Sequence, residues 1–430
     1  MGKTRKIFAY IIITYFLLLL GGATKFISNF DPRAGAAGVI LYSVIFLLLA
    51  SLAKKPLLDF KSIVFFSALA LWTALHFVFD QELKYLPFVW FWMYLMGAYL
   101  LVRSFGYSFL GYFVRIVCAL SIISIFFWSI QLLFGTEELV SIAPFPGRFT
   151  TTSRTFLFYN AFKEVEQEDF VASIPRNSGF AWEPGRFASI LILAIAIQII
   201  TNRGRFSLKN RINLILTTTL ITTFSTTGYV SFFILFTINL LAGKRMKKWV
   251  KIAFLVCTLL VFGYVSTLPF MTRKILARAD SELFVTDGSS MQKSITNDSS
   301  VTVDRFEGLF LDGVNFIHDP IIGYGLAQQN TYISRNVSDL LVTSNGITKT
   351  FAKWGCVFGL SFFVLLFLAS SRLARCFKYN VKWFLFVTIL MISISYDFFE
   401  DPIVLSLTLY PVFRYDKSYK NIFIRRRKVR

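Results

Sequence analysis

The sequence predicts an all-α integral membrane protein with about twelve transmembrane helices and two large external (periplasmic) loops. Three observations predict this class. Hydrophobic residues make up 55% of the 430-residue chain and charged residues only 16%, well below the roughly 25% charge of a soluble domain. The apolar residues gather in runs near the roughly 20 residues that a helix needs to cross a bilayer. Basic residues gather in alternate connections between these runs.

Apolar runs of this kind are expected to be helices, because lipid leaves no partner for an unpaired backbone N–H or C=O group. They divide the chain into a five-helix membrane part at 1–134, a four-helix part at 187–268, and a three-helix part with a basic tail at 350–430. Two external loops, 135–186 and 269–349, separate these parts. The predicted helices are 7–22, 36–53, 60–79, 86–102, 108–134, 187–201, 212–224, 229–242, 252–268, 350–369, 383–397 and 402–413.

The distribution of charge predicts which side each connection faces. The two ends and every second connection hold about 29 of the 45 Lys and Arg residues but only two acids, Asp59 and Asp416. The opposite side holds about 16 basic residues and 22 acids, although it includes both long loops. Because Lys and Arg accumulate on the cytoplasmic side, we expect both termini to be cytoplasmic. Within 225–228, Ser-Thr-Thr-Gly is expected to be a tight external turn, with Gly228 permitting the chain reversal.

The net charge of +21 has a membrane explanation rather than a nucleic-acid one. The charge lies in short loops beside apolar runs, where it controls topology and contacts anionic lipids. We therefore expect no nucleic-acid partner. The four cysteines fall outside the two long loops and show no metal-ligand spacing, so we expect neither a disulfide framework nor a metal or other cofactor.

The most informative stretch for chemistry is 176–187, RNSGFAWEPGRF, which runs directly into a predicted helix. Pro184 suits the first position of a helix, which would place Glu183 beside the first-turn amides and Arg186 in the first turn. The competing interpretation is a capped helix whose arginines extend toward lipid head groups.

Two further stretches of the second loop carry candidate residues. In HDPIIGYGL, His318 precedes a turn, and glycines on both sides of Tyr324 allow a close backbone approach to a ligand. In TSNG, Asn345 is a candidate site residue, but Asn is also an ordinary helix starter. Arg305 lies in DRFEG, earlier in the same loop. External arginines of this kind suit the oxygens of a phosphate, which guanidinium groups bind bidentately.

Four of these segments, in this order, resemble the Wzy-like polymerase and O-antigen ligase superfamily of bacterial surface-glycan assembly. They are RNSGFAWEPGRFA, the STTGY turn, DRFEGLFL with HDPIIGYGL, and SNGITKTFAKWGCVFGLSFF. The resemblance covers roughly residues 170–370. It implies a GT-C-like glycosyltransferase of the bacterial inner membrane that acts on undecaprenyl-diphosphate-linked glycan at the external face. Membrane lipids and a chain-length regulator would be its further partners.

The resemblance implies a polymerase of repeat units for O-antigen, capsule or exopolysaccharide. A ligase is the first alternative, but ligases typically carry histidine where this chain has Ser344. A lipid-linked oligosaccharide flippase is the second, and it is less favoured because the predicted spans hold little charge.

Residue roles follow from the resemblance and the chemistry. The arginines would neutralise the departing diphosphate without a metal, and a carboxylate would take the proton of the attacking hydroxyl. The acids Asp397, Glu400 and Asp401 are a weaker candidate for a cation site. We expect catalytic roles for Glu183, Arg176 and Arg305, and substrate-binding roles for Arg186, His318, Tyr324, Asn345, Gly179 and Trp182.

Overall fold

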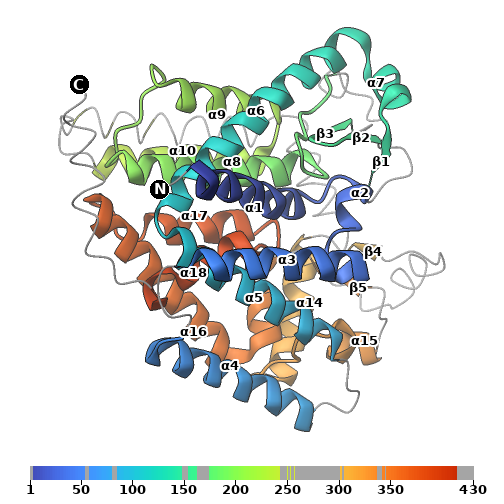
Figure 1. Cartoon of the computed structure of the whole chain (residues 1–430), viewed down its shortest axis with the longest axis vertical. Helices are drawn as coiled ribbons and strands as arrows, with labels where there is room; N and C mark the ends of the chain where they lie inside the picture. Colours follow the sequence, from blue (N-terminus) through green and yellow to red (C-terminus); the bar gives the residue numbers. More distant parts are fainter. Residues whose placement is uncertain are drawn as a thin grey trace.

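The computed structural model describes residues 3–53, 58–79, 85–147, 154–161, 174–242, 249, 252, 256, 301–302, 305–336, 341–343 and 345–413. These residues are predominantly helical (Figure 1). The longer helices are α1 (Lys3–Gly21), α3 (Ala36–Leu52), α4 (Phe60–Phe79), α5 (Leu86–Phe105), α6 (Ser108–Phe134), α8 (Pro184–Thr201), α9 (Arg211–Thr222), α10 (Thr226–Ala242), α14 (Arg305–His318), α16 (Gly346–Phe377), α17 (Phe384–Ser393) and α18 (Pro402–Phe413).

Short helices and strands lie at one end of this bundle. They are α2 (Lys25–Ser28), η1 (Pro32–Ala34), α7 (Thr136–Ile142), η3 (Gln328–Asn330) and α15 (Tyr332–Asn336). A three-stranded antiparallel sheet is formed by β1 (Phe145–Pro146), β2 (Arg154–Phe156) and β3 (Tyr159–Ala161), and β4 (Val301–Thr302) pairs in parallel with β5 (Leu341–Val342). Thr155 pairs with Asn160 in the larger sheet, and Val301 pairs with Leu341 in the smaller one.

The predicted helical class is confirmed. Every predicted run coincides with a helix except 252–268, which lies outside the described residues apart from positions 252 and 256. Within the described part of the chain, six helices are long and apolar enough to cross a membrane: α1, α4, α5, α6, α8 and α16. The 12 residues of α9 rise only about 18 Å, short of a hydrocarbon core of roughly 30 Å. Twelve full crossings therefore remain a prediction.

The helix ends separate into two sets that match the predicted alternation. We call one set the loop end: it carries α7, both sheets, α14, α15 and the starts of α8, α10, α16 and α18, and it lies on the right in Figure 1. At this end Trp182 N donates to Gly21 O over 3.1 Å. The opposite end is the basic end, where the connections 202–210 and 378–383 meet: Tyr379 Oη donates to Asn239 Oδ1, and Asn239 Nδ2 donates to Gly204 O.

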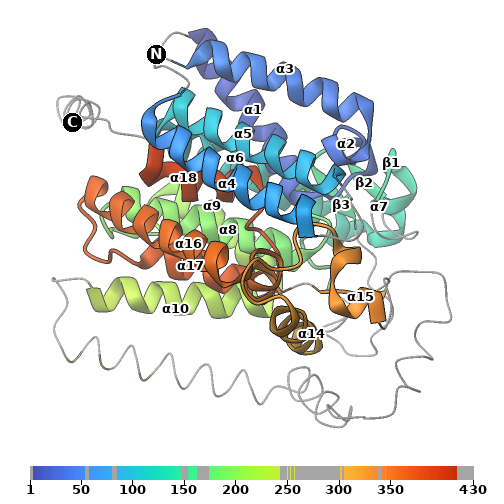
Figure 2. The ribbon, with the colours of Figure 1, turned by 90° about the horizontal axis from the view of Figure 1, so that it is seen from below.

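Helix α8 is the centre of the bundle. Its apolar residues are buried on all faces, as expected of a helix that is hydrophobic all round. Pro184 occupies its first position, as the sequence predicted. Figure 2 shows α8 and α16 between α3 on one side and α10 on the other. Residues at the start of α8 are therefore held in place by surrounding helices.

Helix α16 is broken near its start. Gly355 has φ +67° and ψ −179°, which is not helical, so Gly346–Trp354 forms a half-helix. The loop between α14 and η3 pairs with the backbone groups freed by the break: Tyr324 N donates to Ala352 O, Gly325 N to Lys353 O, and Cys356 N to Pro320 O, over 2.8–3.0 Å. Non-helical backbone at membrane depth is tolerated where protein supplies such partners.

The 223–225 turn corrects one expectation. The chain does reverse between α9 and α10, but the residue with positive φ is Phe224, at +45°. Gly228 lies inside α10, where an added Cβ would stand 2.7 Å from Ala188 Cβ of α8. Its lack of a side chain therefore permits close packing of α10 on α8, and the reversal does not depend on it.

Candidate functional site

The connection between α17 and α18, residues 394–401, is the centre of the loop end, and we call it the hub segment. Glycines of two other helices lie against its Tyr396: Gly185 of α8 approaches the hydroxyl, and an added Cβ on Gly346 of α16 would stand 2.9 Å from the carbonyl oxygen. Ser395 Oγ donates to Thr227 Oγ1 of α10 over 3.3 Å. The starts of α8, α10 and α16 therefore meet around one segment, from which α18 also begins.

Arg186 joins the first turn of α8 to the hub segment. Its Nη2 lies 3.6 Å from Asp401 Oδ2, and its guanidinium carbon lies 4.9 Å from the centre of the Phe398 ring. Its Nε donates to Leu20 O over 2.6 Å. The Arg186 and Asp401 side chains are 17% and 15% exposed, so this ion pair is largely shielded from solvent.

A second ion pair lies beside the first. Arg33 binds Asp31 through Nε and Nη2, at 2.7–3.1 Å, and Tyr94 Oη donates to Asp31 Oδ1 over 2.8 Å. Burial of the Asp31 carboxyl favours a raised pKa, but the hydrogen bonds and charge of Arg33 outweigh it and lower that pKa. Arg33 also acts electrostatically on Asp401, so the two pairs form one network.

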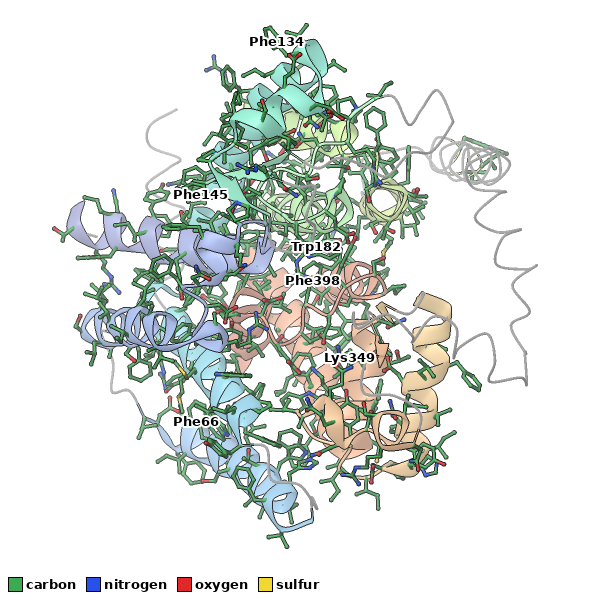
Figure 3. All side chains as sticks on the ribbon, turned by 90° about the vertical axis from the view of Figure 1, so that its right-hand side faces the viewer. Phe66, Phe134, Phe145, Trp182, Lys349 and Phe398 are labelled. Atoms are coloured by element: carbon green, nitrogen blue, oxygen red, sulfur yellow. The ribbon has the colours of Figure 1, made fainter. Side chains whose placement is uncertain are left out.

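Two lysines of the α16 half-helix complete the network. Lys353 Nζ lies 2.7 Å from Glu400 Oε1 and 3.5 Å from Asp397 Oδ2, and Lys349 Nζ lies 3.8 Å from the same Asp397 oxygen. Burial would raise the pKa of Asp397, but the charges of Lys353 and Lys349 lower it. Figure 3 views the loop end directly, with Trp182, Phe398 and Lys349 toward its centre.

Asp312 of α14 reaches the same region. Its carboxylate accepts hydrogen bonds of 2.8 Å from Thr343 Oγ1 and Thr348 Oγ1. Burial raises the pKa of Asp312 to about 6, against the effect of these hydrogen bonds and of the Lys349 charge. Thr348 lies in the first turn of α16, so this contact anchors α14 to the half-helix.

Asp401 differs from the other carboxylates of the hub segment. Burial raises its pKa to about 7, against the lowering effects of Arg186 and Arg33, and the nearby acids Asp397 and Asp31 raise it further. A carboxyl group that titrates near neutral pH can accept or release a proton under ordinary conditions. With every group ionised, the network holds four cations and five carboxylates: Arg33, Arg186, Lys349, Lys353, Asp31, Asp312, Asp397, Glu400 and Asp401.

The sequence-predicted residues of the 176–187 stretch lie at the loop end. Glu183 is the N-cap residue of α8, but its side chain makes no capping hydrogen bond to that helix. Arg176 Nε donates to Thr223 O at the end of α9 over 3.3 Å. Gly179 has φ +52° and lies against the Phe187 ring. Trp182 is half-buried, and its carbonyl accepts a hydrogen bond from Asn160 Nδ2.

The predicted residues of the second loop are more dispersed. Asn345 caps α16 by accepting from Ile347 N and Thr348 N, which is the ordinary structural role considered above. Tyr324 is buried; Gly323 lies against the backbone of α16, and Gly325 lies against the His76 ring of α4. His318 is exposed at the end of α14 and stacks on Tyr332, with ring centres 3.5 Å apart. Arg305 begins α14, and its side chain lies outside the described residues.

Sequence reasoning missed Lys349, Lys353, Arg33 and Asp31. The available signal was the i, i+4 spacing of the two lysines at the entrance to an apolar run, and Asp31-Pro-Arg33 in a short external connection. Each of the six candidate spans contains an 18-residue stretch with at most two charged residues, and both lysines lie in the half-helix at the start of α16. Where the structure describes the chain, no group of three or more His, Cys, Asp or Glu residues could hold a metal ion.

Comparison with protein-family models, with curated proteins and with solved structures finds no match for this chain. The chain is therefore a membrane-embedded helical protein with a buried charge network at its loop end.

Proposed function

We propose that this protein is a membrane glycosyltransferase of the polysaccharide polymerase type. It would join undecaprenyl-diphosphate-linked oligosaccharide repeat units into a surface polysaccharide at the external face of the bacterial inner membrane. The proposal rests on one observation: segments that carry the sequence-predicted motifs, although distant in sequence, meet around the hub segment. The start of α8 follows RNSGFAWE, the start of α10 follows the 223–225 turn, and α16 begins within SNG.

The arrangement of helices suits an anionic leaving group. Four helices, α8, α10, α16 and α18, begin around the hub segment, so their positive dipole ends converge there. Backbone N–H groups at such ends favour phosphate. Arg186 adds a guanidinium that can bind two oxygens of a diphosphate at once, and Lys349, whose closest hub carboxylate is 3.8 Å away, adds a point charge.

The reaction requires little covalent participation by the protein. A hydroxyl of the acceptor sugar attacks the anomeric carbon of the donor, the new C–O bond forms, and the bond to the diphosphate oxygen breaks. The hydroxyl proton passes to a carboxylate. Glu183 remains a candidate for this base, and Asp401 is a second because it pairs with Arg186 at the same helix start. Positioning of donor and acceptor supplies the rest of the rate enhancement.

Two alternative functions can be distinguished from the polymerase by one assay. A ligase would use the same donor but a lipid A core acceptor. A flippase is favoured by one structural observation, because the broken helix α16 with buried Lys353 resembles the discontinuous helices at transport sites.

The test is reconstitution of the purified protein in liposomes with a lipid-diphosphate-linked repeat unit on the accessible face. A size ladder of products supports the polymerase. Transfer only to an added lipid A core supports the ligase. Movement of the lipid-linked unit across the bilayer, without any new glycosidic bond, would replace both with the flippase.

A further inference from the structure

An apolar cleft lies between α3, α4 and α5, the helices coloured blue to cyan in Figure 2. Its volume is about 680 Å³. Aromatic and aliphatic side chains form its walls, among them Phe46 and Leu47 of α3, Phe77 of α4, and Phe88 and Met96 of α5. A cleft of this size and lining has room for a hydrocarbon chain.

Three of the four polar side chains in the cleft wall are paired locally, and the fourth, the buried Tyr42 hydroxyl, has no hydrogen-bond partner among the described residues. Ser43 Oγ donates to Val39 O of its own helix over 2.8 Å, and Thr73 Oγ1 donates to Leu69 O over 2.9 Å. Trp92 Nε1 in turn donates to Thr73 Oγ1 over 3.1 Å. The wall therefore presents an almost entirely apolar surface, and apolar cavities stay dry and accept hydrocarbon ligands.

The wall of the cleft lies next to the charge network of the loop end. Tyr42 lines the cleft, and its ring lies 5.8 Å from that of Tyr94. The Tyr94 hydroxyl donates to Asp31, and the Arg33 guanidinium carbon lies 5.3 Å from the centre of the Tyr94 ring. Two aromatic rings thus connect the apolar wall to an ion pair that also acts on Asp401.

Arg33 is placed to meet a head group. Its side chain is 44% exposed, whereas that of Asp31 is 3% exposed. Among the described residues its hydrogen bonds to Asp31 use Nε and Nη2, which leaves the N–H groups of Nη1 for another acceptor. Guanidinium N–H groups bind phosphate oxygens strongly.

We propose that this cleft binds the isoprenoid chain of a polyprenyl phosphate or diphosphate, with Arg33 at its head-group end. The inference rests on the proposed function for the identity of the lipid. The cleft would hold the donor by its chain while the diphosphate lies toward the hub segment.

The test uses the full-length protein in nanodiscs and a polyprenyl monophosphate that carries a photoreactive group in its chain. After illumination, labelled peptides are mapped by mass spectrometry. We expect label on α3 and α5, competed by unlabelled polyprenyl phosphate but not by phosphatidylglycerol. Label spread evenly over the lipid-facing helices, or competed equally by phosphatidylglycerol, overturns the proposal.

Two variants of α3 test whether the label depends on the cleft. Leu47→Trp fills the cleft from α3, and Ile40→Trp is its control because Ile40 is a 64% exposed residue of α3 that does not line the cleft. We expect Leu47→Trp to reduce labelling about tenfold, equivalent to roughly 1.4 kcal/mol of binding free energy, and Ile40→Trp to leave it unchanged. Equal labelling of the two variants contradicts the proposal.

The binding assay needs no acceptor, so the two proposals fail separately. Specific label in the cleft with no polymer from the reconstituted protein would refute the polymerase but retain the lipid site. Polymer formation with label elsewhere would refute the lipid site but retain the polymerase.

Discussion

Arg186 Nη2 of α8 lies 3.6 Å from Asp401 Oδ2, at the start of α18, although the two residues are separated by most of the C-terminal half of the chain. This ion pair fixes the first turn of the most buried helix against the hub segment. It also gives the arginine of the EPGR sequence an internal partner. A substrate diphosphate would have to compete with Asp401 for Arg186, and protonation of Asp401 would ease that competition.

Arg186→Lys is expected to reduce polymer formation strongly. Lysine keeps the charge, but it cannot bind two phosphate oxygens in a planar fork or stack equally on Phe398. The product ladder of the variant, measured at matched protein amounts, checks this. A full-length ladder from Arg186→Lys would mean that bidentate binding is not required.

Arg176→Ala tests the second described arginine of the stretch. Arg176 lies beside the end of α9, where its Nε donates to Thr223 O, so loss of polymer could also reflect a displaced α9. The thermal unfolding midpoint Tm of the purified variant separates the two causes. We expect lost polymer with a nearly unchanged Tm; a large drop in Tm would assign Arg176 a structural role.

Stability should depend on pH through Asp401. Its pKa rises on folding from about 4 to about 7, so the folded state holds this proton more tightly than the unfolded state. The free energy of unfolding contributed by Asp401 therefore falls as pH rises from about 4 to about 7. Asp401→Asn should flatten this part of the Tm-against-pH curve relative to the natural protein. An identical pH dependence in both proteins would contradict the perturbed carboxyl.

Lys353 should matter more for stability than Lys349. Removing Lys353 leaves both Asp397 and Glu400 without their closest cation, and an uncompensated buried charge costs about 3–5 kcal/mol. Lys353→Met should therefore lower Tm well below that of Lys349→Met. Combining Lys353→Met with Glu400→Gln should recover part of the loss, and the absence of any recovery would show that the ion pair is not the cause.

Gly355→Ala should destabilise the break in α16. An alanine would hold a strained positive φ, and its Cβ would meet the carbonyl of Ile321. The strain alone costs about 1–3 kcal/mol. Gly111→Ala in α6 is the control, because an added Cβ there meets nothing within 4 Å. We expect a lower Tm for Gly355→Ala and an unchanged or slightly higher Tm for Gly111→Ala.

The membrane class and the helices were predictable because apolar run length is a local property. Helix α8 begins at Pro184 as predicted, and the helix ends alternate between the two ends of the bundle as predicted. The partners of charged residues were not predictable, since Arg186 with Asp401 and Lys353 with Glu400 are contacts between distant segments. The glycines around Tyr324 were identified as sites of close approach, but the sequence could not show that the backbone of α16 approaches Gly323 and the His76 ring approaches Gly325.

The loop at 320–325 does more than complete a broken helix. Its three backbone hydrogen bonds to residues 352–356, and the bond from Trp72 Nε1 to Ile322 O, tie it to the bundle on two sides. A cut in the chain after α15 would thus leave both new ends attached by non-covalent contacts. The protein should accordingly tolerate assembly from two separately expressed fragments divided at that point, with its last three described helices supplied in trans.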